Sequence, residues 1–145
     1  MTAGPRVDWE ALERAARDAR ANAHAPYSRY RVGAAVLAAD GRVFAGCNVE
    51  NASFGATVCA ERSAVVAMVT AGQRELCAVL VVTRGPEAGS PCGICRQTLA
   101  EFAADAPVRL LAVDDDDPAF GVQGSRETSV AALLPLAFRG ALVTG

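Results

Sequence analysis

Two short cysteine motifs constrain the fold of this chain more than any other feature of its sequence. The first is Cys59-Ala60-Glu61, and the second, which begins about thirty residues later, is Pro91-Cys92-Gly93-Ile94-Cys95. One tetrahedral Zn²⁺ can bind all three thiolates only where the two motifs lie together, and three protein ligands leave its fourth position open for water. A nearby glutamate that is not a ligand can move the protons of that water. The motifs therefore indicate an open zinc site suited to metal-assisted hydrolysis, since a structural zinc site would need a fourth ligand.

Both motifs are predicted to begin helices. Cys59 precedes an apolar stretch over residues 64–69, and the second motif precedes a segment that runs to Phe102. The free N–H groups and the positive end of a helix favour thiolate over thiol, and thus metal binding at neutral pH. Arg62 follows Cys59 by three residues, so it would share a helix face with that thiolate and offset part of the negative charge around the metal. Glu61 would point away from that face, toward the bound water.

Charge and composition exclude several function classes. Sixteen acidic residues stand against fourteen basic ones, and there is no basic cluster of the kind that nucleic-acid binding needs. All fourteen basic residues are arginine, which excludes a Schiff-base lysine, pyridoxal phosphate attachment and a P-loop lysine. We therefore expect a small-molecule substrate and no nucleic-acid partner.

Length, termini and cysteine count favour a single cytoplasmic domain covering residues 1–145. The first ten residues lack a targeting pattern, and the longest apolar run, around residues 78–82, is too short to span a bilayer. We therefore expect no membrane partner. Five cysteines, an odd number without small-scaffold spacing, argue against a disulfide framework. The length suits one hydrophobic core.

Hydrophobic periodicity predicts an α/β sandwich. Asp8 is the expected N-cap of a first helix, and Asp40-Gly41 favours a tight type I′ turn between two antiparallel strands. A helix from Cys59 should end at Gly72, before a central buried strand. The expected strands cover residues 32–37, 43–45, 76–83, 109–113 and 120–123, and the expected helices begin at residues 9, 59, 92 and 130.

Other residues that suggest chemistry have ordinary interpretations. A CxxC motif that begins a helix also occurs in thioredoxin-like redox proteins, but such a protein has no use for Cys59-Ala60-Glu61. Cys47 and Cys77 are expected to be core thiols. His24 is expected to be an exposed imidazole at the end of the first helix and not a catalytic group. The acidic run at residues 114–117 is expected to be a solvated loop, because a Ca²⁺ loop alternates its ligands.

The cysteine and glutamate motifs resemble those of the zinc-dependent nucleobase deaminases, whose signature is His or Cys, then Glu, then PCxxC. Three further segments are similar to the small homotetrameric cytidine deaminases: residues 26–35 (PYSRYRVGAA), 46–51 (GCNVEN) and 133–138 (LLPLAF). The resemblance extends from about Asp8 to Phe138, with the motifs in the order and spacing of that family.

The resemblance implies a three-layer α/β/α sandwich around a mixed central sheet of about five strands. It implies one Zn²⁺ per subunit, held by Cys59, Cys92 and Cys95, with Glu61 as the catalytic acid and base and Arg62 tuning the metal. The implied reaction is hydrolytic deamination of cytidine, and of 2′-deoxycytidine, to the uridine product and ammonia in cytoplasmic pyrimidine salvage. The implied assembly is a homotetramer whose active sites are completed across subunits.

The resemblance also implies roles for five substrate-binding residues. The matching Asn48 and Glu50 hydrogen-bond the ribose, chiefly its 3′-hydroxyl, and main-chain groups near Ala60 contact the base. Tyr30 lies against base and sugar at a position that is usually Phe, and its extra hydroxyl needs a partner. Phe138 matches an aromatic residue that a neighbouring subunit contributes to the base pocket.

Two alternative functions remain open from the sequence. One is a related deaminase of another nucleoside, or of a nucleoside antibiotic such as blasticidin S, although residues 48–51 favour an ordinary nucleoside. The other is a zinc-stabilised binding module without activity, which would need a fourth protein ligand that closes the site and would leave Glu61 unexplained.

Phe54 stands where the family often has Tyr, so a hydrogen bond from the tyrosine hydroxyl is lost in this chain.

Overall fold

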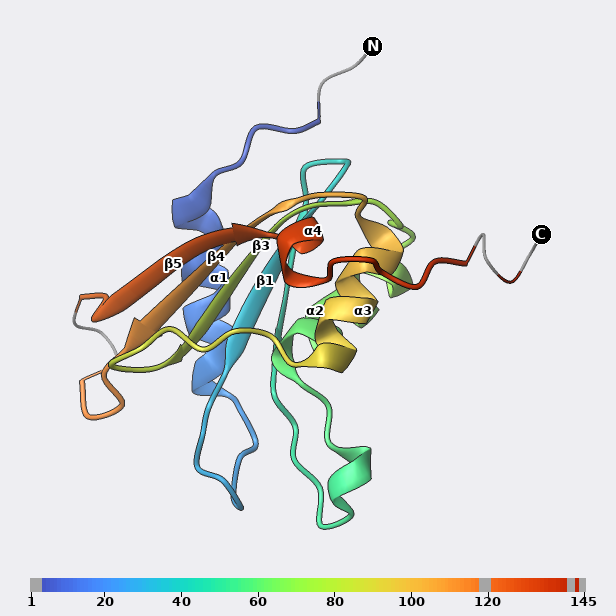
Figure 1. The fold of residues 1–145 in the computed structure, drawn as a ribbon. Helices are drawn as coiled ribbons and strands as arrows, with labels where there is room; N and C mark the ends of the chain where they lie inside the picture. Colours follow the sequence, from blue (N-terminus) through green and yellow to red (C-terminus); the bar gives the residue numbers. More distant parts are fainter. Residues whose placement is uncertain (1–3, 118–120, 141–142, 144–145) are drawn as a thin grey trace.

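A five-stranded mixed sheet forms the centre of the molecule in the computed structural model, which describes residues 4–117, 121–140 and 143 (Figure 1). Its strand order is β2-β1-β3-β4-β5. Strands β3 and β4 are parallel, and the other neighbouring pairs are antiparallel. The strands are β1 (Gly33–Ala38), β2 (Val43–Cys47), β3 (Leu76–Arg84), β4 (Pro107–Val113) and β5 (Gly124–Ser129).

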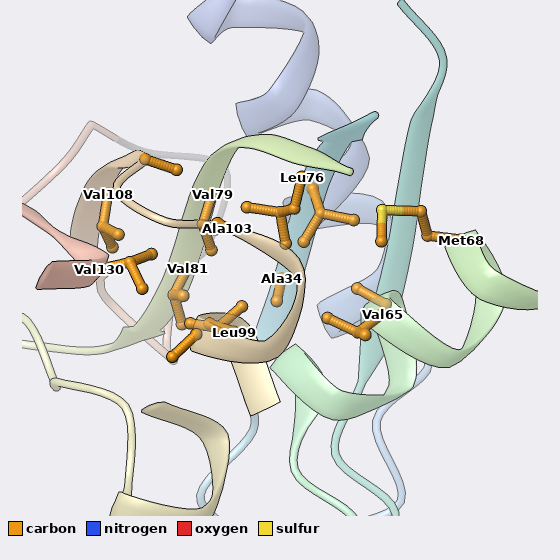
Figure 2. Packing of buried hydrophobic residues seen from close by; sticks show 14 of the residues in the cluster. Ala34, Val65, Met68, Leu76, Val79, Val81, Leu99, Ala103, Val108 and Val130 are labelled. Atoms are coloured by element: carbon orange, nitrogen blue, oxygen red, sulfur yellow. The ribbon is translucent and has the colours of Figure 1, made fainter. Parts of the chain in front are cut away.

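Helices cover both faces of this sheet, which gives three layers (Figure 1). Helix α1 (Trp9–Ala21) lies on one face, and α2 (Ala60–Thr70), α3 (Gly93–Phe102) and α4 (Val130–Leu133) lie on the other. Strand β3 supplies both cores, because successive side chains point to opposite faces. Val79 and Val81 pack with Leu99 of α3 (Figure 2), and Leu80 packs with Leu12 of α1. The predicted α/β sandwich with a mixed five-stranded sheet is confirmed.

Two glycines allow the helices to approach the sheet closely. A Cβ atom at Gly33 would lie 1.9 Å from the Ala16 carbonyl oxygen of α1. On the other face, a Cβ at Gly46 would lie 2.5 Å from the Ala64 amide nitrogen of α2. No side chain larger than hydrogen fits at either position without moving a helix. The position of α2 matters for function, because Cys59 precedes this helix.

The helix ends follow the predicted capping residues. The Asp8 carboxylate accepts a hydrogen bond from the Ala11 amide (3.1 Å) as the N-cap of α1. Helix α2 ends before Gly72, whose φ of +94° places it in the left-handed region. Among the helices of the described residues, none is both long and apolar enough to cross a membrane.

Two details of the sheet differ from the sequence predictions. The β1–β2 connection is not a type I′ turn, because Gly41 has a positive φ and Asp40 does not. The Gly41 amide instead donates to the Ala38 carbonyl, as in a three-residue hairpin loop with glycine in the left-handed position. The last strand is not at residues 120–123: Phe120 lies outside the described residues, residues 121–123 are not in a strand, and β5 begins at Gly124. This edge strand is polar and largely exposed, so it carries little hydrophobic signal.

Candidate active site

The three predicted ligands come together at the N-termini of two neighbouring helices. Cys59 is the N-cap residue of α2, and Cys92 is the N-cap residue of α3. Cys95 lies in the first turn of α3 and is buried. All three Sγ atoms lie within 4.8 Å of one another, and those of Cys59 and Cys92 are 3.7 Å apart. The fold thus forms one cluster of three thiols from two separate motifs.

The dimensions of this cluster fit a zinc ion. Ligands at the usual Zn–S distance of about 2.3 Å around a tetrahedral ion lie roughly 3.8 Å from each other. The separation of 3.7 Å between the Cys59 and Cys92 sulfurs matches that spacing. Within the described part of the chain, this is the single group of three or more His, Cys, Asp or Glu residues with metal-binding geometry. A fourth protein ligand is absent from this group, as an open site requires.

The environment of Cys59 favours its thiolate. Hydrogen bonds from Cys95 and then Arg62 lower the pKa of the Cys59 thiol to about 5 in the metal-free protein, although partial burial opposes the shift. The same interaction with Cys59 raises the pKa of Cys95. The Arg62 guanidinium lies 3.8 Å from the Cys59 sulfur and donates to the Thr57 carbonyl at 3.1 Å. Arg62 therefore occupies the predicted position beside the thiolates.

Glu61 is buried next to this cluster. Its side chain is 4% exposed, and burial raises the pKa of its carboxyl to about 7. It lines the same cleft as Cys59 and Cys92. A carboxyl group with a pKa near neutrality both accepts and releases protons readily, as proton transfer in both directions requires.

The cleft has a volume of about 270 Å³ and lies on the face of the sheet that α2 and α3 cover. Most predicted site residues line it: Tyr30, Asn48, Glu50, Cys59, Ala60, Glu61 and Cys92. Ser28, Thr83 and Ser90 also line this cleft. The fold therefore brings the expected metal ligands, the carboxylate and the expected sugar-binding residues to one cavity.

Asn48 and Glu50 both hold the loop that precedes β1. The Asn48 side chain accepts from the Val32 amide (2.9 Å) and donates to the Tyr30 carbonyl (2.7 Å). The Glu50 carboxylate accepts from the amides of Tyr27 (2.9 Å) and Ser28 (3.1 Å) and from the Ser28 hydroxyl. These hydrogen bonds lower the pKa of the Glu50 carboxyl group, and the bond from the Ser28 hydroxyl has the largest effect. Both side chains thus have structural partners as well as a place in the cleft.

The Tyr30 ring is held between an arginine and a glycine. The Arg84 guanidinium lies 5.3 Å from the centre of the Tyr30 ring, within cation–π range. On its other end, a Cβ at Gly89 would lie 2.6 Å from the Tyr30 hydroxyl. Gly89 in turn donates its amide to the Thr83 hydroxyl (2.9 Å). The hydroxyl that the sequence adds at this position therefore lies against Gly89, where any larger residue would require the Tyr30 side chain to shift.

Phe138 is not part of this cleft in the single chain. It is 58% exposed and lies beside α3, where its carbonyl accepts from the Gln97 side chain at 3.0 Å. Phe54 is also exposed and makes an edge-to-face contact with Tyr27 at 5.8 Å between ring centres. Both aromatic rings are thus open to a partner molecule.

Sequence reasoning missed a residue that positions the second cysteine motif. Arg96, on the first turn of α3 after Cys95, donates to the Pro91 carbonyl (2.7 Å), to the Leu133 carbonyl (2.9 Å) and to the Ser90 hydroxyl (3.1 Å). It fastens the segment before Cys92 to the C-terminal part of the chain. The sequence signal that could have identified Arg96 was its position four residues after Cys92, about one helical turn further along the chain.

The remaining candidates lie outside the cluster. Cys47 and Cys77 are free, partly buried thiols on β2 and β3. His24 follows α1, and its backbone pairs with Asn48 and Glu50. The acidic run is more than a solvated loop, because Asp115 forms an ion pair with the buried Arg20.

Comparisons with known proteins agree with this geometry. Residues 7–110 match the family model described as the cytidine and deoxycytidylate deaminase zinc-binding region. The cytidine deaminase of Sporosarcina psychrophila is 44% identical over 91% of this chain and 92% of its own length. That of Mycobacterium tuberculosis is 46% identical over 81% of this chain and 93% of its own length.

Solved structures show the same similarity in three dimensions. The crystal structure of cytidine deaminase from Burkholderia pseudomallei matches with a TM-score of 0.80 and 41% identity, over 91% of this chain and all of that one. The structure of the Mycobacterium tuberculosis enzyme matches with a TM-score of 0.73 and 41% identity, over 92% of this chain and 98% of that one. Because the sequence match spans most of the chain and includes all three clustered cysteines, the chain belongs to the cytidine and deoxycytidylate deaminase family of zinc-binding proteins.

Proposed function

We propose that this protein hydrolyses the exocyclic amine of cytidine, and of 2′-deoxycytidine, to give the uridine product and ammonia. The observation that carries the proposal is the meeting of three clustered thiols and a buried carboxyl group, Glu61, in one cleft with Asn48 and Glu50. Metal-assisted hydrolysis needs the thiols and the carboxyl group. Recognition of a nucleoside needs polar groups, such as those of Asn48 and Glu50, within hydrogen-bonding reach of its sugar.

Cys59, Cys92 and Cys95 would hold one Zn²⁺ per subunit. Bound there, the ion supplies Lewis acidity that lowers the pKa of a coordinated water from about 15.7 toward about 7. Arg62 offsets the negative charge of the thiolates through its contact with the Cys59 sulfur. Without such a cation, three thiolates would weaken the Lewis acid.

Glu61 is the proton carrier in this proposal. It takes a proton from the attacking water and delivers it to N3 of the base while the water oxygen bonds to C4. It then moves the remaining proton of that C4 hydroxyl to the amino group, so that the C4–N bond breaks, the C4 carbonyl forms and ammonia leaves. Its raised pKa of about 7 supports both directions of transfer. The buried main chain at Ala60 borders the cleft and is available to contact the amino group and base.

Asn48 and Glu50 are proposed to bind the ribose, chiefly its 3′-hydroxyl. Each is already oriented by hydrogen bonds to the loop at residues 27–32, so neither loses rotamer freedom when a nucleoside binds. A carboxylate acceptor beside an amide suits a sugar diol and discriminates against analogues that lack the hydroxyl. Tyr30 completes the wall beside base and sugar.

The test is a substrate panel on purified protein with measured zinc content. Cytidine is followed by its ultraviolet absorbance change and by ammonia release, with adenosine, cytosine and blasticidin S alongside. Turnover of cytidine is expected. Turnover of another panel member in its place would assign the chain to a different deaminase, and inactivity of zinc-loaded protein on the whole panel would favour a binding module.

We also propose that the chain assembles as a homotetramer in which Phe138 enters the cleft of a neighbouring subunit. The exposed aromatic ring of Phe138 supports this, as do Leu136 and Ile94, which are exposed apolar residues. Sedimentation analysis of the holoenzyme tests the assembly. A monomer with full activity would contradict it.

A cytoplasmic location is part of the same proposal. All five cysteines are free in the structure, and a reducing compartment keeps such thiols available to a metal. Fractionation of cells that express the full chain, with detection by antibody, tests this location.

A further inference from the structure

A second cavity lies on the opposite face of the sheet from the cysteine cleft. It has a volume of about 350 Å³, within the range of small-molecule sites. Val82 of β3 lines it, whereas the neighbouring Val81 and Thr83 line the cleft, and alternate residues of a strand point to opposite faces. The two cavities are therefore separated by the sheet.

The lining of this second cavity is strongly basic. Arg17 and Arg20 come from α1, and Arg29 and Arg31 come from the loop before β1. Asp115 is the one carboxylate among the described residues that line it. Four arginines thus line the cavity with one carboxylate, and only Arg17 among them has a second acid, Glu13, as an ion-pair partner at 2.9 Å. We call this feature the arginine cavity.

Arg20 shows that the cavity is built by the fold and is not a chance cluster of surface side chains. It is 5% exposed, its Nε donates to the Arg31 carbonyl at 3.0 Å, and its NH2 group bonds the Asp115 carboxylate. Asp115 also lies 3.8 Å from Arg84. Asp115 is therefore shared between Arg20 and Arg84, and Arg17 pairs with Glu13. The charges of Arg29 and Arg31 are the ones left without a paired acid among the described residues.

Arg29 and Arg31 supply free donors. Within the described residues, neither guanidinium has a hydrogen-bond or ion-pair partner, and both side chains are exposed at the cavity. Arg29 lines the cavity and has a φ of +57°, an unfavourable conformation for a residue of its size. Like charges held together in this way repel one another, and an anion would relieve that repulsion.

From this geometry we infer that the arginine cavity is a binding site for a phosphate-bearing anion, separate from the cysteine cleft. Planar guanidinium groups bind phosphate oxygens in bidentate fashion, and several of them around one cavity match the charge of a phosphate group. Free phosphate and the phosphates of a nucleotide share this chemistry. The site adds to the proposed deaminase function and does not depend on it.

The test is isothermal titration calorimetry on the zinc-loaded protein at fixed ionic strength, with inorganic phosphate in one arm and adenosine triphosphate in the other. Binding of at least one of these ligands is expected. The ligand that binds more tightly identifies whether the site takes free phosphate or the phosphates of a nucleotide. The variant Arg29→Asn/Arg31→Gln should weaken that binding at least about tenfold, because each lost contact is a charge-assisted hydrogen bond. Asn tolerates the positive φ at position 29.

The matched control is Arg74→Gln/Arg126→Gln, which removes the same charge from two exposed arginines outside the arginine cavity. It should bind phosphate or nucleotide as the parent protein does. Far-ultraviolet circular dichroism and zinc content check the fold of each variant, and Arg31→Gln alone serves if the double variant does not fold. Absence of binding at about 10 mM ligand, or equal loss in the control variant, overturns the proposal.

Discussion

The Sγ atoms of Cys59 and Cys92 lie 3.7 Å apart although thirty-three residues separate them in the chain. Each residue is the N-cap of its own helix, so the distance is set by how α2 and α3 pack side by side on the sheet. Gly46 permits the close approach of α2, and Arg96 holds the segment before Cys92. The metal site is therefore a product of helix packing and not of a local loop.

Replacing Cys59 with alanine is expected to abolish stoichiometric zinc binding together with deamination. Two sulfur ligands remain, and the hydrogen-bond network that favours the thiolate is lost. Metal analysis of the purified variant measures the effect. Cys77→Ala is the matched control, because Cys77 is a free thiol on β3 outside the cluster, and it should retain one zinc per chain. Full zinc occupancy in Cys59→Ala would show that another residue is the ligand.

Glu61→Gln is expected to keep zinc and fold but to reduce kcat by about 10²–10⁴, the usual contribution of a positioned acid or base. The amide has nearly the same shape as the carboxyl group in this buried position, but it cannot accept and release the proton. Steady-state kinetics with cytidine and zinc analysis provide the measurements. Glu75→Gln, at an exposed position before β3, is the control. Near-normal turnover in Glu61→Gln would remove Glu61 from its proposed role.

Gly89→Ala is expected to lower kcat/KM for cytidine by about tenfold to a hundredfold by displacing Tyr30. The added Cβ would lie 2.6 Å from the Tyr30 hydroxyl, which is too close for two heavy atoms. The double variant Tyr30→Phe/Gly89→Ala lacks that hydroxyl and should recover most of the loss. Tyr30→Phe alone is the control. If the double variant is no better than Gly89→Ala, the clash with Tyr30 is not the cause.

Ser28→Ala is expected to raise the pKa of Glu50 toward its ordinary value of 4.5, because the Ser28 hydroxyl is the largest cause of its depression. A carboxyl group whose pKa is lowered by folding stabilises the fold above its unfolded pKa, and this contribution disappears as the pH falls through the folded pKa. Carbon-detected NMR titration of Glu50 measures the shift. Ser125→Ala, on the exposed edge strand β5, should leave the Glu50 pKa unchanged. An unchanged value in Ser28→Ala would contradict the assignment.

Co-expression of Glu61→Gln and Phe138→Ala chains is expected to restore activity that neither variant has alone. In a mixed assembly, some clefts contain an intact Glu61 and receive Phe138 from a neighbouring subunit. Two affinity tags isolate the mixed species, and its specific activity is compared with that of each parent. A mixture no more active than the sum of its two parents would mean that Phe138 acts within its own chain or not at all.

The cysteine motifs could be interpreted from sequence because their signals are local. A cysteine before each helix is a local signal, and for α2 so are Arg62 near its start and Gly72 after its end. The structure confirms α2 and α3 after these two cysteines. The central strand β3 could also be predicted, since a strand that is buried on both faces reads as a continuous apolar run.

Other features of the fold gave little or misleading local signal. Strand β5 at the sheet edge is polar, so its pairing with β4 depends on the partner strand and not on its own hydropathy. The dipeptide Asp40-Gly41 suits two kinds of hairpin loop. The Asp40 carboxylate accepts hydrogen bonds from the Arg42 amide and guanidinium, and these bonds favour the three-residue loop over the type I′ turn.

The sequence by itself determined the donor chemistry of this protein, namely three thiols, one carboxyl group and the helices that begin beside them. Only the tertiary structure decided which groups meet. The pair of Arg20 and Asp115 joins residues ninety-five positions apart, and the contact of Glu50 with Ser28 joins residues twenty-two apart. Residue types and their periodicity specify which face of an element is buried, but distances between elements follow from how helices and strands pack against one another. The arginine cavity is of this second kind, because its four arginines share a site only after α1 packs against the loop before β1.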